Sequence, residues 1–324
     1  IKKNITLDWY PVGTGPYQLT ENDPNSRMVL EKNSNFHAEY YPEEGEPTDL
    51  ALGLLDDRGK KLPFIDKVVF TLEKENTSYW NKFLQGYYDI SGISSDSFDQ
   101  AIQVASKGEF LLSDAMKEKG IALKTAIAAS TSYIGFNMQD PIVGGYSDAS
   151  KNLRQAISIA VDYEEYISIF LNGRGIPAQG PIPPGIFGYS DGEAGLNHQV
   201  YDWEQHAAKR KSLDKARELL VKAGYPAGRS QKTGEPLTLY FDVPASGPDA
   251  KAQFDWLRKQ FNKLGLQLVI RSTDYNRFQD KMRNGQAQLF QWGWNADYPD
   301  PENFLFLLYG PNSKSVTGGE NAAN

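Results

Sequence analysis

The sequence predicts an α/β protein built in two parts, and three observations support this prediction. The chain has 324 residues, which is about the length of two average domains. Its charge changes near residue 130, since residues 1–130 carry a net charge of −6 and the remainder carries −1. Finally, residues 237–294 alternate strand and helix patterns in the order β-α-β-α-β. This order is typical of an α/β sheet that binds ligands near the carboxyl ends of its strands.

The composition argues against several classes of function. With 40% hydrophobic and 23% charged residues, the chain is typical of a soluble globular protein. A net charge of −7 and a pI near 5.2 argue against nucleic acid or anionic lipid as a partner, because both need a basic protein surface. The absence of cysteine excludes disulfides, thiolate nucleophiles and cysteine-bound metals, and only three histidines remain as imidazoles. We therefore expect no metal site and no cofactor.

The ends of the sequence indicate a fragment. The chain has no initiator methionine, no hydrophobic region of a signal peptide, and no apolar run near the roughly 18 residues that a membrane span needs. It starts at Ile1 and stops at Asn324 without an obvious boundary signal. We expect both ends to result from processing, cloning or proteolysis.

In the first part, short runs of apolar and β-branched residues predict strands at residues 27–31 and 67–72. Residues 40–61, rich in Glu, Pro, Asp and Gly, are expected to form a solvated loop with room for one helical turn at 49–55. A helix is predicted at 78–84, where a capping Ser or Thr precedes three apolar residues that share a face.

The middle of the chain contains a predicted strand at residues 131–137 that leaves one domain for the other. A helical pattern follows over residues 153–161, and Asp162 with Glu165 forms a predicted capping box that starts a second helix. Residues 177–185 contain four prolines, which remove four backbone donors and exclude a helix.

The last part is the most regular. Apolar residues recur at helical spacing over residues 213–223, and Gly224 followed by Pro226 is the usual signal for the end of a helix. The patterns after this helix predict strands at 237–243, 266–270 and 287–294, and helices at 254–264 and after the capping residue Asp274.

The most informative group of residues follows the last predicted strand. Trp292, Trp294, Asp297, Tyr298 and Asp300 bring flat apolar rings and two carboxylates to the end of one strand. Such a combination suits a small ligand that carries a cationic group. The alternative interpretation, in which the tryptophans belong to the core and the aspartates cap proline-rich turns, has about equal support from composition.

Three kinds of enzyme or phosphate site fit the sequence poorly. A glycosidase pair would need carboxyl groups about 5 to 9 Å apart across a scissile bond, and the turn containing Asp297 and Asp300 does not establish this. A serine-hydrolase triad lacks its Gly-x-Ser-x-Gly motif, and the three histidines lie in polar surroundings. The Gly13-Thr14-Gly15 loop lacks the lysine of a phosphate-binding loop.

Six short motifs occur in the order seen in one protein family. They are Pro11-Val12-Gly13-Thr14-Gly15-Pro16-Tyr17, Phe83-Leu84-Gln85-Gly86-Tyr87-Tyr88-Asp89, Tyr133-Ile134-Gly135-Phe136-Asn137, Leu153-Arg154-Gln155-Ala156-Ile157 with Ala160-Val161-Asp162, Ala223-Gly224-Tyr225-Pro226, and residues 294–301. Through them the chain resembles the extracellular solute-binding proteins of family 5, which serve ABC transporters of the dipeptide, oligopeptide and nickel type. Residues 62–66 and the acidic loop before them further resemble the subgroup of the oligopeptide binder YejA.

The resemblance implies a two-lobed α/β fold of the periplasmic-binding-protein type (type II, cluster C). Family members are larger than this chain, so residues 1–130 correspond to part of lobe I and residues 131–324 to most of lobe II. The segment at 131–137 would then be a crossover between lobes that close over a ligand by a hinge.

The resemblance also implies the ligand-binding residues. In the family, the Asp of the Trp-x-x-Asp pattern, here Trp294 and Asp297, pairs with the N-terminal ammonium of a peptide. Trp292, Tyr133 and Asn137 are further candidates for wall or polar contacts, and packing at a hinge explains these three about equally well. No catalytic residue is predicted.

The function implied by the resemblance is that of a binding protein rather than an enzyme. It would capture short peptides in the periplasm or outside the cell, as a monomer that is tethered to the membrane in the full-length protein, and deliver them to an ABC permease. Other cargoes stay open on the same scaffold: a murein peptide, an opine, a glycoside or a metal chelate. The alternative from another class is a carbohydrate-active hydrolase that uses Asp297 and Asp300.

Overall fold

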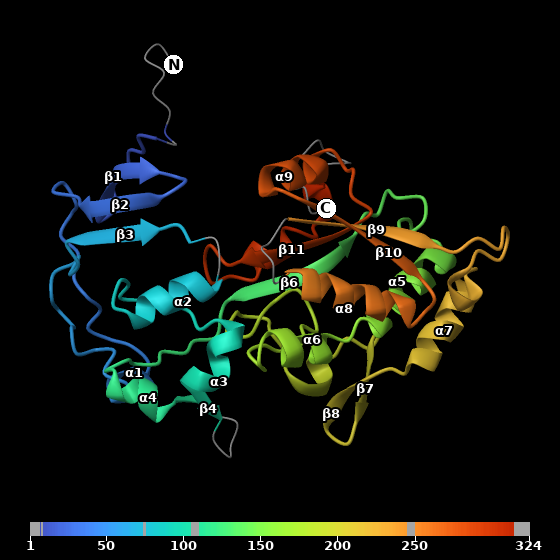
Figure 1. The fold of residues 1–324 in the computed structure, drawn as a ribbon, viewed down its shortest axis with the longest axis horizontal. Helices are drawn as coiled ribbons and strands as arrows, with labels where there is room; N and C mark the ends of the chain where they lie inside the picture. The colour runs from blue at the N-terminus through green and yellow to red at the C-terminus, as the bar shows by residue number, and fades with distance from the viewer. Residues whose placement is uncertain (1–6, 8, 74–75, 105–109, 245–249, 314–324) are drawn as a thin grey trace, which may run out of the picture. The chain divides into compact units, whose positions relative to one another are not determined.

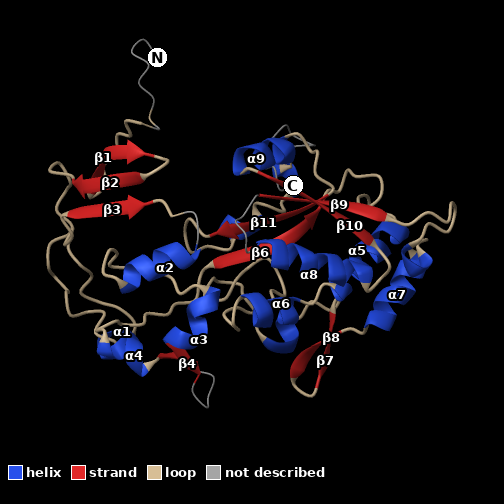
Figure 2. Ribbon diagram, in the orientation of Figure 1, coloured by secondary structure: helices blue, strands red, loops and turns tan. Residues whose placement is uncertain are grey.

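The computed structural model describes residues 7, 9–73, 76–104, 110–244 and 250–313. The chain divides into two compact units, Ile1–Gly92 and Ile93–Asn324, which we call unit 1 and unit 2. Both contain helices and strands (Figure 2), so the predicted α/β class is confirmed.

Unit 1 contains a three-stranded antiparallel sheet in the order β1-β2-β3. The strands are β1 (Tyr17–Asp23), β2 (Arg27–Lys32) and β3 (Lys67–Thr71). The predicted strands at 27–31 and 67–72 and the helix at 78–84, which is α2 (Asn76–Leu84), are therefore confirmed. The single helical turn of the acidic loop is α1 (Pro47–Ala51), slightly earlier than expected.

Unit 2 is built on a four-stranded sheet in the order β10-β9-β11-β6. Its members are β6 (Ser130–Phe136), β9 (Thr238–Pro244), β10 (Gln267–Thr273) and β11 (Leu289–Asn295). β9 pairs in parallel with β10 and β11, whereas β6 pairs antiparallel with β11 at the edge. The predicted β-α-β-α-β order is thus confirmed, because a helix connects each pair of successive parallel strands.

Helices cover both faces of this sheet (Figure 1). On one face, α5 (Asp148–Ala160), α7 (Leu213–Lys222) and α8 (Ala250–Asn262) bury the main core with the odd-numbered residues of β9, such as Phe241. On the other face, α9 (Tyr275–Arg283) covers a smaller cluster that includes Phe278 and Phe290. Side chains alternate along β9, so those of neighbouring residues point to opposite faces of the sheet.

The predicted helix caps are present, with one correction. Asp274 and Asp162 accept hydrogen bonds from the backbone N–H groups of Arg277 and Glu165, and these caps start α9 and α6 (Tyr163–Phe170). The expected reciprocal half of the capping box at Glu165 is wrong. Its carboxylate instead accepts bonds from Trp256 at 3.0 Å and from Gln260 of α8 at 2.8 Å, because these donors are buried and need an acceptor.

Residues 93–129 belong to the same compact unit as the sheet that follows them. The Ser95 hydroxyl donates to the carbonyl of Phe170, and Arg174 donates to the carbonyl of Ile93. The Arg174 guanidinium also lies 4.8 Å from the centre of the Phe98 ring. These contacts explain why the compact units divide at residue 92, whereas the boundary near residue 130 concerns the lobes of a larger protein and stays a prediction.

Several short elements had no corresponding prediction. The strand β1 and two hairpins, β4–β5 and β7–β8, are examples, and each strand pairs with one near in sequence. The remaining short elements are β4 (Ile102–Val104), β5 (Phe110–Leu112), β7 (Tyr201–Glu204), β8 (Ala207–Arg210), α3 (Phe98–Ala101), α4 (Asp114–Glu118), α10 (Glu302–Leu305), and the 3₁₀ turns Ser95–Ser97, Gly192–Gly195, Pro226–Gly228 and Gly310–Asn312.

Candidate functional site

The two tryptophans of β11 pack against aromatic rings of different elements. Trp292 lies edge-on to Phe278 of α9, with ring centres 5.5 Å apart, and contributes to the smaller core cluster. Trp294 meets Phe306, just after α10, in a similar edge-on contact at 5.1 Å. Both side chains are partly buried. Trp292 therefore packs as the core interpretation expects, whereas Trp294 also faces open space, as described below.

Among the described residues, the second half of β11 has no neighbouring strand on the side away from β6. Hydrogen bonds from Asn137 N–H to Gln288 O and from Ala296 N–H to Ala129 O bracket the β6–β11 ladder. Because antiparallel pairs alternate, the even-numbered residues of β11 direct their N–H and C=O groups at β6 and the odd-numbered residues direct theirs away. On that other side, β11 pairs with β9 only through Leu289 and Phe290. Within the described part of the chain, the backbone groups of Gly293 and Asn295 therefore have no strand partner.

Asp297 lies on the turn directly after this part of β11, and its side chain is exposed. Asn303, a side chain of α10 with 3% of its surface exposed, holds the turn in place. The Asn303 Oδ1 accepts one bond from the Asp297 backbone N–H at 2.8 Å and another from the Trp294 indole Nε1–H at 3.0 Å. Its Nδ2 donates to Asp297 Oδ2 over a long 3.5 Å. One amide thus joins the two residues of the Trp-x-x-Asp pattern.

The other acidic residues of the turn bond locally. Asp300 Oδ1 accepts the backbone N–H of Glu302 at 2.8 Å, which fits the interpretation that this aspartate caps a proline-containing turn. The Tyr298 hydroxyl donates to the Glu302 carboxylate, and this bond raises the pKa of Tyr298. The Asp300 side chain therefore bonds the first residue of α10.

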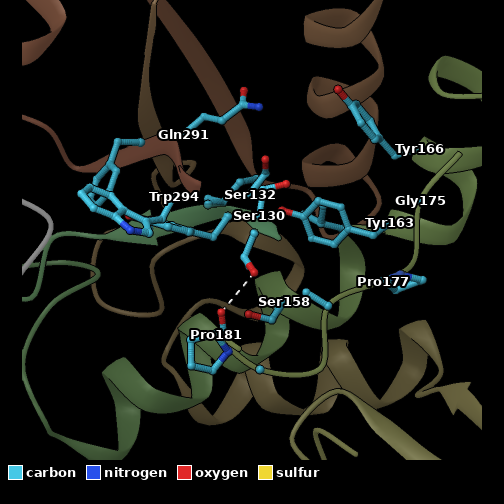
Figure 3. A pocket seen from close by; sticks show the side chains of 18 of the residues that line it. Ser130, Ser132, Ser158, Tyr163, Tyr166, Gly175, Pro177, Pro181, Gln291 and Trp294 are labelled. Atoms are coloured by element: carbon cyan, nitrogen blue, oxygen red, sulfur yellow. Dashed lines mark hydrogen bonds between the residues drawn. The ribbon is translucent and has the colours of Figure 1, made fainter. Parts of the chain in front are cut away.

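A pocket of about 1750 Å³ lies within unit 2, along β6 and the end of β11. Figure 3 shows Trp294 and Gln291 of β11 near Ser130 and Ser132 of β6, with Tyr163 and Tyr166 of α6 farther along the pocket. Residues of the proline-rich loop line it as well, and the Thr131 hydroxyl of β6 donates to the Pro181 carbonyl at 3.0 Å. The pocket is thus bordered by the strand end, the edge strand and the loop at 177–185.

Two candidates on or after β6 line this pocket, but in different ways. Tyr133 is partly buried, and its burial raises the pKa of its hydroxyl. Asn137 uses its amide inside the protein, since Nδ2 donates to the carbonyls of Gly285 and Ala287 at 3.1 and 2.8 Å. Its Oδ1 accepts the Gln139 N–H at 3.0 Å. These bonds support the packing interpretation for Asn137.

The structure brings only some of the five predicted site residues to the pocket. Tyr133, Asn137 and Trp294 line it, whereas Trp292 packs under α9 and Asp297 lies on the adjoining turn. Their direct contact with a ligand stays a prediction. Asn303 was not predicted, and the sequence offers only a weak signal for it: an uncharged amide in the apolar segment Asn303-Phe304-Leu305-Phe306.

The described residues contain neither a candidate metal cluster nor a membrane-spanning helix. No group of three or more His, Cys, Asp or Glu side chains is arranged to hold a metal ion within the described ranges. None of the helices in those ranges has the length and apolar character needed to cross a membrane.

Comparison with protein families gives one match over nearly the whole chain. Residues 2–315 match the family described as bacterial extracellular solute-binding proteins, family 5 Middle. The chain belongs to this family. The predicted resemblance is thereby confirmed at the level of the family, while the finer resemblance to the YejA subgroup stays a prediction.

Individual relatives carry names of binding proteins. The chain is 23% identical over 318 residues to heme-binding protein A of Haemophilus influenzae, covering 96% of this chain and 46% of that protein. It is 23% identical over 304 residues to the dipeptide-binding protein of Escherichia coli, covering 94% of this chain and 46% of the relative. The chain therefore spans about half the length of these curated relatives.

Solved structures confirm the fold class. The periplasmic binding protein DppA of Helicobacter pylori, determined in complex with the peptide STSA, matches with a TM-score of 0.67 at 20% identity. The match covers 96% of this chain and 49% of that structure. At this identity the likeness establishes the periplasmic-binding-protein type of fold, and the coverage agrees with the expectation of a partial chain.

Proposed function

We propose that the protein containing this chain is the substrate-binding component of an ABC importer and that it captures short peptides. In this proposal Asp297 pairs with the N-terminal ammonium of the peptide, and backbone groups at Gly293 and Asn295 bond the peptide main chain. Trp294 and Tyr133 provide apolar walls. The proposal rests on membership of a family of solute-binding proteins and on relatives named for dipeptides.

The observation that carries the proposal is the edge of β11 beside an exposed carboxylate. Gly293 and Asn295 lack a strand partner among the described residues, and Asp297 follows two residues later. An extended peptide can add to such an edge through main-chain hydrogen bonds, which do not depend on its side-chain sequence. A carboxylate at the end of the edge supplies the acceptor that a peptide amino terminus needs when it leaves water.

The decisive experiment compares two aspartates of the same turn in the full-length protein. We expect Asp297→Asn to weaken the binding of short peptides more than about tenfold, because the ammonium loses its charged partner. Asp300→Asn is the matched control, since it removes one charge from the same turn at a residue whose side chain bonds the backbone N–H of Glu302. Isothermal titration calorimetry with di- to pentapeptides measures both. Equal affinities of Asp297→Asn and wild type would refute the ammonium role.

A second measurement separates binding from hydrolysis. The proposed binder turns over no chromogenic glycoside, and its melting temperature rises when peptide is added. Glycoside turnover that is lost in Asp300→Asn would instead favour the carbohydrate-active alternative.

The partners and the location follow from the same proposal. A solute-binding protein of an importer acts in the periplasm or outside the cell and presents its cargo to a membrane permease. We propose that it does so as a monomer, without a cofactor or a nucleic-acid partner, and that tethering to the membrane is a property of the full-length protein. Co-purification with a permease of the same operon would support the partner.

A further inference from the structure

Asn303 occupies an unusual position for a polar side chain. It is buried in the four-residue helix α10, next to the fully buried Phe304 and close to the buried Leu307. Those two apolar side chains already anchor the turn that follows Asp297. The Asn303 side chain adds three polar contacts to Trp294 and Asp297, and a further one to the Tyr298 hydroxyl of the same turn.

The oxygen and the nitrogen of the Asn303 amide have different partners. Its Oδ1 accepts two N–H groups at 2.8 and 3.0 Å, which fixes the end of β11 and the turn relative to each other. Its Nδ2 lies 3.5 Å from Asp297 Oδ2, and the same amide also hydrogen-bonds the Tyr298 hydroxyl. No described residue bonds the second carboxylate oxygen, Asp297 Oδ1. The amide therefore makes a weak contact with one oxygen of the carboxylate, and the other oxygen has no partner among the described residues.

We propose that Asn303 is a positioning residue that holds the Asp297 carboxylate in its binding orientation before a peptide arrives. A group that is already oriented loses little conformational freedom on binding, so a preorganised carboxylate gains affinity for an ammonium group. This inference rests on the proposed role of Asp297. It adds that selectivity for a free amino terminus depends on a buried amide that itself never touches the ligand.

The test uses the full-length protein and a pair of probes, trialanine and N-acetyl-trialanine, which differ in the charged amino terminus. We expect wild type to prefer trialanine by more than about tenfold. We expect Asn303→Ala to reduce this preference to less than about threefold, because the loose carboxylate no longer meets the ammonium in one geometry. Asn312→Ala is the matched control: its amide donates to the Phe306 carbonyl in the same region without contacting Asp297 or Trp294. It should keep the wild-type preference.

A measurement on wild type covers the case in which Asn303→Ala fails to fold. In the ligand-free protein, the Trp294 indole N–H and the Asp297 amide N–H should exchange with solvent much more slowly than exposed amides, as ¹H–¹⁵N spectra report. Fast exchange of both would overturn the inference. An undiminished trialanine preference in a folded Asn303→Ala variant would also overturn it. Equal binding of the two probes by wild type, with slow exchange retained, would instead refute the ammonium role and leave the positioning of the turn in place.

Discussion

Asp242 shows how one residue links three elements of unit 2. Its carboxylate is fully buried in β9 and accepts bonds from Arg271 of β10 and, at 2.7 Å, from Lys281 of α9. The Arg271 guanidinium also lies 5.0 Å from the centre of the Tyr240 ring. Two partly exposed cations share a single buried acceptor, so the loss of that charge removes the carboxylate partner of both.

We expect Asp242→Asn to lower the free energy of unfolding by about 3 kcal/mol, toward the lower end for a broken buried pair because both cations are partly exposed. Asp255→Asn, which breaks an exposed pair with Arg258 in α8, should cost less than about 0.5 kcal/mol. Urea denaturation of the full-length variants measures both values. A similar loss of unfolding free energy in the two variants would show that Asp242 and its two cations stabilise the protein no more than an exposed ion pair does.

At the scale of single residues, the sequence indicated candidate site residues better than it indicated what each side chain contacts. Asp297 and Trp294 could be singled out because a carboxylate and an aromatic ring after a strand suit ligand binding. Asn137 belongs to an equally recognisable motif and Trp292 to the same aromatic group as Trp294, yet their side chains bond and pack internally. Asn303 could not be predicted, since its role depends on the fold of a turn that brings it back to the end of β11.

At the scale of elements, two loops of unit 2 meet through their glycines. Gly228 has a φ of +75°, and an added Cβ would lie 2.2 Å from the carbonyl oxygen of Gly265, at the turn between α8 and β10. Gly224 at the end of α7 has a similar φ of +87°, but an added Cβ would meet nothing within 4 Å. A substitution at Gly224 thus tests the backbone conformation alone, whereas one at Gly228 tests the conformation and close packing together.

We expect Gly224→Ala to destabilise the protein by about 1 kcal/mol, which is the cost of a left-handed conformation for a residue with a Cβ. Gly228→Ala should cost about 3 kcal/mol, because the clash with a backbone oxygen is added to the same conformational cost. Thermal unfolding of both variants gives the comparison, and equal shifts in melting temperature would contradict the packing argument.

Unit 1 contains a carboxylate that links two elements and whose stabilising effect depends on pH. The Glu73 carboxylate accepts bonds from Lys82 and Tyr88 and, at 3.1 Å, from Ser78, so it ties the segment after β3 to α2. The bond from Lys82, followed by that from Tyr88, lowers the pKa of Glu73 to about 2. A depressed pKa in the folded state means that the ionised form stabilises the fold.

We therefore expect the stabilisation by Glu73 to be complete above about pH 4.5 and to disappear as the pH falls toward about 2. Glu73→Gln should melt at a lower temperature than wild type at pH 6, and the two should converge near pH 2. Melting curves across this range provide the measurement. A difference in melting temperature that did not change with pH would assign the effect to packing.

The elements that the sequence predicted best are those with a long hydrophobic period. The helices α5, α7, α8 and α9 and the strands β9 to β11 all present regular apolar faces, and the structure contains each of them. The short hairpins β4–β5 and β7–β8 escaped prediction because three or four residues define no period, and their pairing depends on neighbours in space.

At the scale of the whole molecule, the family motifs predicted the fold and the partial coverage better than the composition did. The sequence predicted a partial two-lobed protein from motif order, and the chain matches its family over residues 2–315 while spanning about half of its relatives. The nature of the ligand lies beyond such patterns, because relatives with the same fold carry names that refer to heme and to dipeptides.

We expect native mass spectrometry of the full-length protein to reveal a co-purified peptide, because a cleft that binds main-chain groups retains ligands from the cell. Addition of a peptide at 100 times its dissociation constant should stabilise the protein by about 2.7 kcal/mol. A co-purified mass that corresponds to a sugar would contradict the peptide assignment.

The backbone groups of Gly293 and Asn295 have no strand partner among the described residues, and this has a consequence for the peptide binding that we propose. A recognition surface made of main-chain groups offers the same bonds to every peptide of suitable length. Different peptides then compete for one site as near equals, and each occupies the receptor in proportion to its abundance. Under the proposed function, uptake would therefore sample the peptide mixture around the cell instead of selecting one member of it.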